Sequence, residues 1–83
     1  MIVIASADSN PALKRFKKFY LVTALDGKEK NYLTYNHGYT FMATRAETAM
    51  RFLLLRDATK QAQLMAKACP KLSGFQAVEA HEI

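Results

Sequence analysis

Residues able to act as nucleophiles are few and stand apart in the sequence. The one cysteine, Cys69, has no histidine near it and falls on an apolar helical stripe, so we expect a buried, inert thiol. No nucleophile-elbow motif surrounds the loop serines, which are Ser6, Ser9 and Ser73. The three glycines are far apart, so no phosphate-binding loop is present. These patterns indicate a protein that is not an enzyme and uses no cofactor.

Two residues near the end of the chain have the spacing of metal ligands on a strand. Glu79 and His81 alternate onto one face, and Glu82 follows them. Catalytic zinc takes three protein ligands, and no third ligand lies at a motif spacing. We therefore expect a solvated chain end and no metal site.

The net charge of +5 comes from 12 Lys and Arg residues against 7 Asp and Glu residues. A basic excess favours acidic partners, either nucleic acid or the acidic face of a protein, although it also serves solubility. Aromatic side chains among basic groups on a sheet can stack on bases while ammonium groups meet phosphates. Strand propensity alone also explains tyrosines at these positions. The residues of this nucleic-acid alternative are Lys17, Lys18, Tyr20, Lys28, Lys30 and Tyr32.

A chain of 83 residues and 9.4 kDa has room for one small domain, residues 1–83, in which residues 1–16 are a candidate for a loosely attached N-terminal segment. The length excludes a dinucleotide-binding fold. No apolar run is long enough to span a bilayer, and no basic residue precedes the first apolar run as in a signal peptide. We expect a cytoplasmic protein without a membrane partner. Its core is small, so homodimer formation stays open.

Period-two alternation predicts a strand from Lys17 that ends at the hairpin signal Asp26-Gly27. A return strand over residues 31–35 and a third over Tyr39–Ala43 would complete a meander. Residues 75–80 are expected to return to the sheet as a strand. Residues 1–5 are either a short edge strand or a tail, and Pro11 predicts a helical turn over residues 12–16.

Thr44 and Glu47 have the spacing of a capping box, and no helix breaker follows before Pro70. One apolar stripe stays in phase from Ala46 to Cys69, which favours a single helix of about 25 residues, long against the usual length. A break near residues 51–56 is the alternative. The fold class is therefore α+β, an antiparallel sheet of three to four strands with one main helix on one face. The expected core is Leu21, Leu33, Phe41, Met50, Leu54, Ala62, Met65 and Phe75.

Residues 52–55 are four apolar residues in a row, which one side of a helix cannot bury together. At least one of Leu53 and Leu55 should then be exposed, bordered by Arg51, Arg56 and Lys60. Such an apolar patch with a basic rim would bind a second copy or an acidic protein face. The competing account is a helix break that places residues 52–55 in the sheet as a short strand and leaves no patch.

Four short motifs resemble a loose pattern of small orphan phage and prophage proteins. They are Tyr32-Leu33-Thr34, Gly38-Tyr39-Thr40, Ala49-x-Arg51-Phe52 and Asp57-Ala58-x-x-Gln61-Ala62. The resemblance implies a meander, one helix and a closing strand, with the phenylalanine in a short extended piece and the helix starting just before the acidic-Ala pair. In this chain Leu54 and Leu55 replace the usual Ser/Thr cap.

Proteins of this kind that are understood, such as anti-CRISPR and anti-restriction proteins, bind and block a host or competitor protein. The resemblance therefore implies a non-catalytic, inhibitory protein-binding function. A small basic nucleic-acid-binding module is the alternative.

Overall fold

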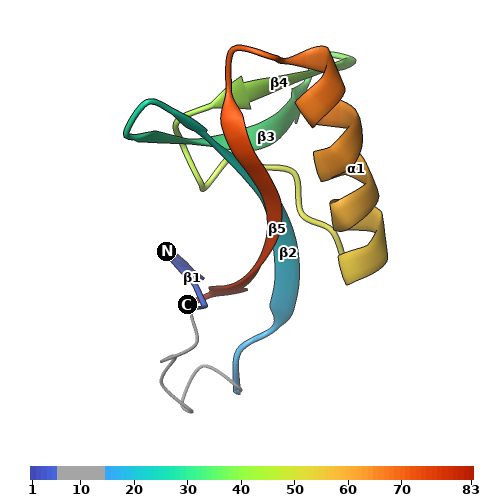
Figure 1. Ribbon diagram of the computed structural model, residues 1–83. Coiled ribbons are helices and arrows are strands. Elements are labelled where there is room, and N and C mark those ends of the chain that lie inside the picture. Colours follow the sequence, from blue (N-terminus) through green and yellow to red (C-terminus); the bar gives the residue numbers. More distant parts are fainter. Residues whose placement is uncertain (6–14) are drawn as a thin grey trace.

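The computed structural model describes residues 1–5 and 15–83 and contains one antiparallel sheet and one helix (Figure 1). The sheet has the strand order β1-β5-β2-β3-β4. The elements are β1 (Ile2–Ile4), β2 (Lys18–Asp26), β3 (Glu29–Asn36), β4 (Tyr39–Ala43), α1 (Leu55–Ala68) and β5 (Ser73–Glu82).

The α+β class is confirmed, and the sheet has five strands where three to four were expected. The additional strand is β1, which pairs with the last residues of β5 from Ile2 opposite Glu82 to Ile4 opposite Ala80. The two ends of the chain consequently lie side by side (Figure 1). A helical turn was expected over residues 12–16. Residues 12–14 of this turn lie outside the described part of the chain.

Tight turns set the register of the meander. His37 and Gly38 connect β3 to β4, and both have positive φ, 51° and 81°. Two central residues with positive φ form a type I′ turn, whose twist suits a two-residue hairpin. Asn36 therefore lies opposite Tyr39, and this register continues along both strands.

Strands β2 and β3 pair only near their shared turn, and another segment occupies the space where they diverge. Their pairing runs from Asp26 opposite Glu29 to Thr23 opposite Tyr32. Beyond this point residues 49–52, hereafter the inserted segment, lie between the two strands. The Met50 N–H donates to the Leu33 oxygen at 2.8 Å.

On its other side the inserted segment pairs with β2. The Phe52 N–H donates to the Tyr20 oxygen at 2.9 Å, and the Tyr20 N–H donates to the Phe52 oxygen at 2.7 Å. These backbone bonds require an extended chain, so the expectation of one helix from Thr44 is wrong and the helix begins at Leu55. The alternative, a break near residues 51–56, is correct about where the helix starts, but residues 44–54 form no helix before it.

Side chains of the inserted segment alternate between the two faces of the sheet, as in a strand. Ala49 packs with the core on the face away from α1, and Arg51 lies over the Phe19 ring on that face. Met50 and Phe52 pack on the α1 face. The chain thus passes through the plane of the sheet, from the loop after β4 on one face to α1 on the other.

Each face of the sheet carries its own core, because side chains of β2 are buried on both sides. On the α1 face, Val22 and Leu33 pack against Ala58 and Ala62. Alanines at these positions let the helix approach β2 and β5 closely. The second core lies on the opposite face and consists of Phe19, Leu21, Ala49 and Ala80.

Most of the expected core residues are buried or half-buried, and two are not. Leu21, Leu33 and Ala62 are buried. Met50, Met65 and Phe75 are half-buried against the α1-side core. Phe41 and Leu54 are exposed, so the expectation for these two is wrong. Phe41 lies on the edge strand β4, facing away from α1, and Leu54 precedes a helix that starts ten residues later than expected.

Truncating Leu21 to alanine should lower the free energy of unfolding by about 2–5 kcal/mol, because the side chain is fully buried and its removal leaves a cavity. The matched control is Leu53→Ala, at a leucine that is 71% exposed. This control should change the free energy of unfolding by less than about 0.5 kcal/mol. Urea denaturation measures both, and equal midpoints for Leu21→Ala and the parent would contradict the core assignment.

Candidate functional site

Three consecutive leucines are exposed where the chain leaves the sheet and enters α1. Leu53, Leu54 and Leu55, hereafter the leucine surface, are 71%, 47% and 50% exposed. The backbone of Phe52 is the last to bond to β2, and α1 begins at Leu55 with no side-chain cap. The expectation that at least one of Leu53 and Leu55 is exposed is confirmed. The competing strand account holds for Phe52 alone.

The basic residues expected around this surface divide between two places. Arg56 and Lys60 are exposed on the first turns of α1. The Arg51 guanidinium lies 4.5 Å from the centre of the Phe19 ring, and its Nη2 lies 3.3 Å from the Glu82 carboxylate. Arg51 is therefore committed to contacts on the opposite face, and the rim of the leucine surface consists of Arg56 and Lys60.

The lysines of the nucleic-acid alternative lie near opposite ends of β2. Lys17 and Lys18 are at its start, whereas Lys28 and Lys30 are at the turn and first residues of β3. At about 3.3 Å per residue, the length of β2 separates the two pairs by about 26 Å. They therefore do not form one patch.

The two tyrosines of that alternative are not free stacking platforms. Tyr20 is half-buried and packs on the α1-side core. Tyr32 is half-buried against the opposite core. The Lys18 Nζ lies 5.8 Å from the centre of the Tyr20 ring and 4.0 Å from the Glu79 carboxylate. This lysine is thus engaged with its neighbours in the sheet.

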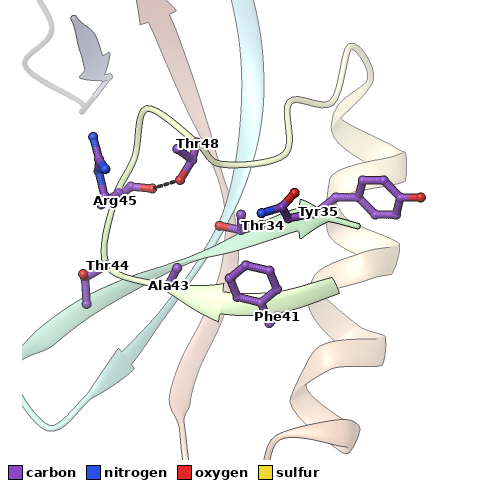
Figure 2. Close-up of a pocket in the computed structure, with 8 residues that line it drawn as sticks. Thr34, Tyr35, Phe41, Ala43, Thr44, Arg45 and Thr48 are labelled. Atoms are coloured by element: carbon purple, nitrogen blue, oxygen red, sulfur yellow. Dashed lines mark hydrogen bonds between the residues drawn. The ribbon is translucent and has the colours of Figure 1, made fainter. Parts of the chain in front are cut away.

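An open pocket of about 540 Å³ lies on β3 and β4 beneath the loop that follows β4 (Figure 2). Figure 2 shows Phe41, Ala43 and Thr34 on the two strands, with Arg45 and Thr48 on the loop beside them. The Thr48 hydroxyl donates to the Arg45 oxygen at 3.4 Å. The lining is Thr34, Tyr35, Asn36, Phe41, Ala43, Thr44, Arg45 and Thr48. The Phe41 ring, the hydroxyls and the Arg45 guanidinium suit a ligand with a flat ring and a phosphate.

Sequence reasoning did not find this pocket, because residues 44–48 were expected to be the first turns of a helix. The alternation of Phe41 and Ala43 on one face of β4 was the available signal. It indicates which face these side chains take but not that a loop lies beside them.

A second hollow, hereafter the β4 groove, lies between β4 and the end of α1 and has a volume of about 490 Å³. It is mostly apolar, and Lys71 is the charged residue in its lining. The lining is Thr40, Phe41, Met42, Met65, Ala68, Cys69, Pro70, Lys71 and Leu72. Cys69 was expected to be buried in the core, and it is instead half-buried at this groove.

His81 is 4% exposed, so the expectation of a solvated chain end is wrong for this residue. Its Nδ1 lies 3.2 Å from the Phe16 backbone oxygen, and its Nε2 lies 3.2 Å from the Glu79 carboxylate. Both partners are acceptors, so each contact is a hydrogen bond only when the nitrogen concerned carries a proton. The contacts tie the chain before β2 to β5.

No group of three or more His, Cys, Asp or Glu side chains able to hold a metal ion occurs among the described residues. Glu79 and His81 do lie on one face as the alternation predicts, and they contact each other. Their geometry assigns them a structural role in holding residues near Phe16.

Comparison with known proteins gives no family or relative from which a function could be inferred. No family model matches the chain, and no curated protein or solved structure gives a match. In the part of the chain that the structure describes, no helix combines the length and apolarity that a bilayer crossing requires.

Proposed function

We propose that the protein is a non-catalytic binding protein that acts by occupying the surface of a partner protein. The observation that carries this proposal is the leucine surface, in which three consecutive leucines remain exposed. Single exposed leucines are ordinary, whereas a contiguous apolar patch with a charged rim is typical of interaction sites.

The energetics of burial support the same conclusion. Full burial of a leucine side chain is favourable by about 1.5–3 kcal/mol. Burial of the exposed half of each leucine by a partner would therefore contribute about 1 kcal/mol to the binding free energy. Arg56 and Lys60 follow on the same helix and favour a partner with carboxylates around an apolar centre. The partner we propose is therefore a host or competitor protein with an acidic face.

The proposal includes an inhibitory role for a phage or other mobile element. Its support is the resemblance of the motifs around Thr34, Thr40, Phe52 and Ala58 to small phage and prophage proteins. In the structure these motifs are packing elements. The Phe52 backbone pairs with β2, and Ala58 on α1 is buried against the sheet. They account for the scaffold that presents the leucine surface rather than for a catalytic site.

Replacing Leu55 with glutamate should abolish partner capture and leave folding intact, because Leu55 is half exposed and the change places a charge in the apolar patch. Leu64→Glu is the matched control: Leu64 is 49% exposed against 50% for Leu55. Nine residues later at 100° per residue, it lies on the opposite side of the same helix. Affinity capture from host extract, followed by titration with the purified captured protein, measures the effect.

The proposal fails if both variants bind the captured protein as tightly as the parent. It also fails if Leu55→Glu does not fold while Leu64→Glu does, since Leu55 would then belong to the core. Sedimentation of the parent and the two variants shows whether the leucine surface instead joins two copies, in which case Leu55→Glu alone lowers the mass.

A second candidate function, nucleic-acid binding, is favoured by the pocket in Figure 2, where Phe41 offers a ring for stacking and Arg45 a guanidinium for phosphate. This pocket replaces the dispersed lysines as the centre of such a site.

If this candidate is correct, Arg45→Gln should weaken binding of a single-stranded oligonucleotide and reduce the slope of log affinity against log salt by about one. Phe41→Ala should weaken binding by about 1–3 kcal/mol without changing that slope. Arg56→Gln removes the same charge at a distance from the pocket and should leave both quantities nearly unchanged. Fluorescence anisotropy at several salt concentrations decides, and equal effects of Arg45→Gln and Arg56→Gln would exclude the pocket.

A further inference from the structure

The outer edge of β4 is open. β4 is the last strand of the sheet, and no backbone hydrogen bond among the described residues joins its outer edge to another segment. An open edge offers unpaired N–H and C=O groups that another extended chain can pair with. It lies at the end of the molecule opposite the leucine surface, because the β4 groove meets the last turn of α1 and the leucines precede the first.

The hairpin geometry identifies which backbone groups face outward. Residues flanking a two-residue turn form a hydrogen-bonded pair, and hydrogen-bonded and non-hydrogen-bonded pairs alternate along an antiparallel ladder. Tyr39, Phe41 and Ala43 therefore bond inward to β3. Thr40 and Met42 direct their N–H and C=O groups to the open edge.

The side chains of the same two residues lead into the β4 groove. Thr40 and Met42 face α1, but α1 packs mainly on β5 and β2 and does not cover this end of the sheet. The remaining space of about 490 Å³ is lined on its far side by Met65, Ala68 and Leu72. A strand added to β4 would point every second side chain into this apolar space.

The charges around the edge are mostly positive. β4 itself carries no charged residue, and the pocket loop, residues 44–48, carries Arg45 and Glu47. Residues 61–78, which contain the second half of α1 and the groove loop, include Lys67 and Lys71 and no Asp or Glu. Carboxylates on an incoming strand would therefore meet cations on both sides of the edge.

We propose that the β4 edge binds an extended acidic segment of a partner protein, which adds to the sheet as a sixth strand. Apolar side chains of the segment enter the β4 groove, and alternate acidic side chains face Arg45 on the other side. Backbone bonds at Thr40 and Met42 supply affinity, and the groove selects the side chains. The inference does not depend on the leucine surface.

A second copy of this chain is a poorer occupant for this edge. Pairing two β4 edges would bring together two copies that each carry a net charge of +5. Like charges brought together in an interface disfavour association. The charge pattern thus favours a carboxylate-rich strand over self-pairing.

The probe is a synthetic peptide of about ten residues that alternates valine and glutamate, with an alternating valine–lysine peptide as its charge control. The Val/Glu peptide should bind saturably and the Val/Lys peptide should not. Thr40→Pro should weaken binding about tenfold, because it removes an outward N–H and places ring atoms in the path of the strand. Proline is tolerated on edge strands, so the fold should persist. Thr40→Val keeps the N–H and should bind within about twofold of the parent.

Amide hydrogen exchange gives a test that needs no variant. On addition of the Val/Glu peptide to the parent protein, the amides of Thr40 and Met42 should gain protection. The amides of Phe41 and Ala43, already bonded to β3, should change little.

Three results would overturn the proposal. The first is no binding of the Val/Glu peptide, or equal binding of the Val/Lys peptide. The second is protection that fails to distinguish Thr40 and Met42 from Phe41. The third is self-association of the parent that Thr40→Pro abolishes, which would make a second copy the occupant. Leu55→Glu should leave peptide binding unchanged, so failure here is separable from failure of the proposed function.

Discussion

The structure depends on the hydrogen bonds that hold the inserted segment between β2 and β3. Those strands pair for four residues beside their turn and then diverge. Without another chain in the gap, backbone groups of Tyr20 and Leu33 would lie unpaired beside two cores. Buried backbone groups without partners cost about 1–3 kcal/mol each. Residues 49–52 remove that cost by bonding to both strands at once.

The same insertion explains why this small domain can have a core on each face of its sheet. A chain that crosses the sheet plane delivers Ala49 to one face and Met50 and Phe52 to the other. It also fixes where α1 can start, since the helix must begin as soon as the chain emerges. The three leucines at that exit have no remaining face of the sheet to occupy. Their exposure is thus a consequence of topology, and it is the basis of the partner-binding role that we propose.

Local patterns predicted the strands, because the evidence for a strand is contained within a few residues. Alternation identified β2 and β3, the turn after β3 pointed to β4, and an apolar-rich segment pointed to β5. The signals at Gly27 and Gly38 marked the two turns. The start of α1 could not be predicted in this way. Ala46, Met50 and Leu54 keep the helical phase of the residues after them. Met50 nevertheless lies in the inserted segment, and Leu54 lies in the short stretch that leads into α1. What decides their conformation is the gap between β2 and β3, which is formed by residues far away in the sequence.

The candidate binding surfaces also divide into those that local sequence patterns predict and those that depend on residues far apart in the sequence. Four apolar residues in a row indicate that some must be exposed, so the leucine surface could be anticipated from the sequence. The pocket beside Arg45 and the groove beside Met65 could not, since both are spaces between a loop or helix and an edge strand. Even the buried contact of His81 with Phe16 depends on how the chain before β2 meets the last strand. Sequence periodicity predicts which residues of one helix or strand share a face. The pocket and the groove form where a loop or helix leaves part of a neighbouring strand uncovered, which periodicity does not predict.

An open strand edge can cause a small protein to aggregate, because other chains can pair with it. The charges near the edge disfavour some of these chains and not others. Natural sheets protect their edges with charged side chains, short strands or covering segments. Here the edge strand β4 is five residues long, and Arg45, Lys67 and Lys71 near it outnumber Glu47. An excess of cations disfavours pairing with another positively charged copy and so opposes edge-to-edge aggregation. This excess does not repel a chain rich in carboxylates. The positive charge that disfavours self-pairing would therefore also favour the acidic partner segment that we propose.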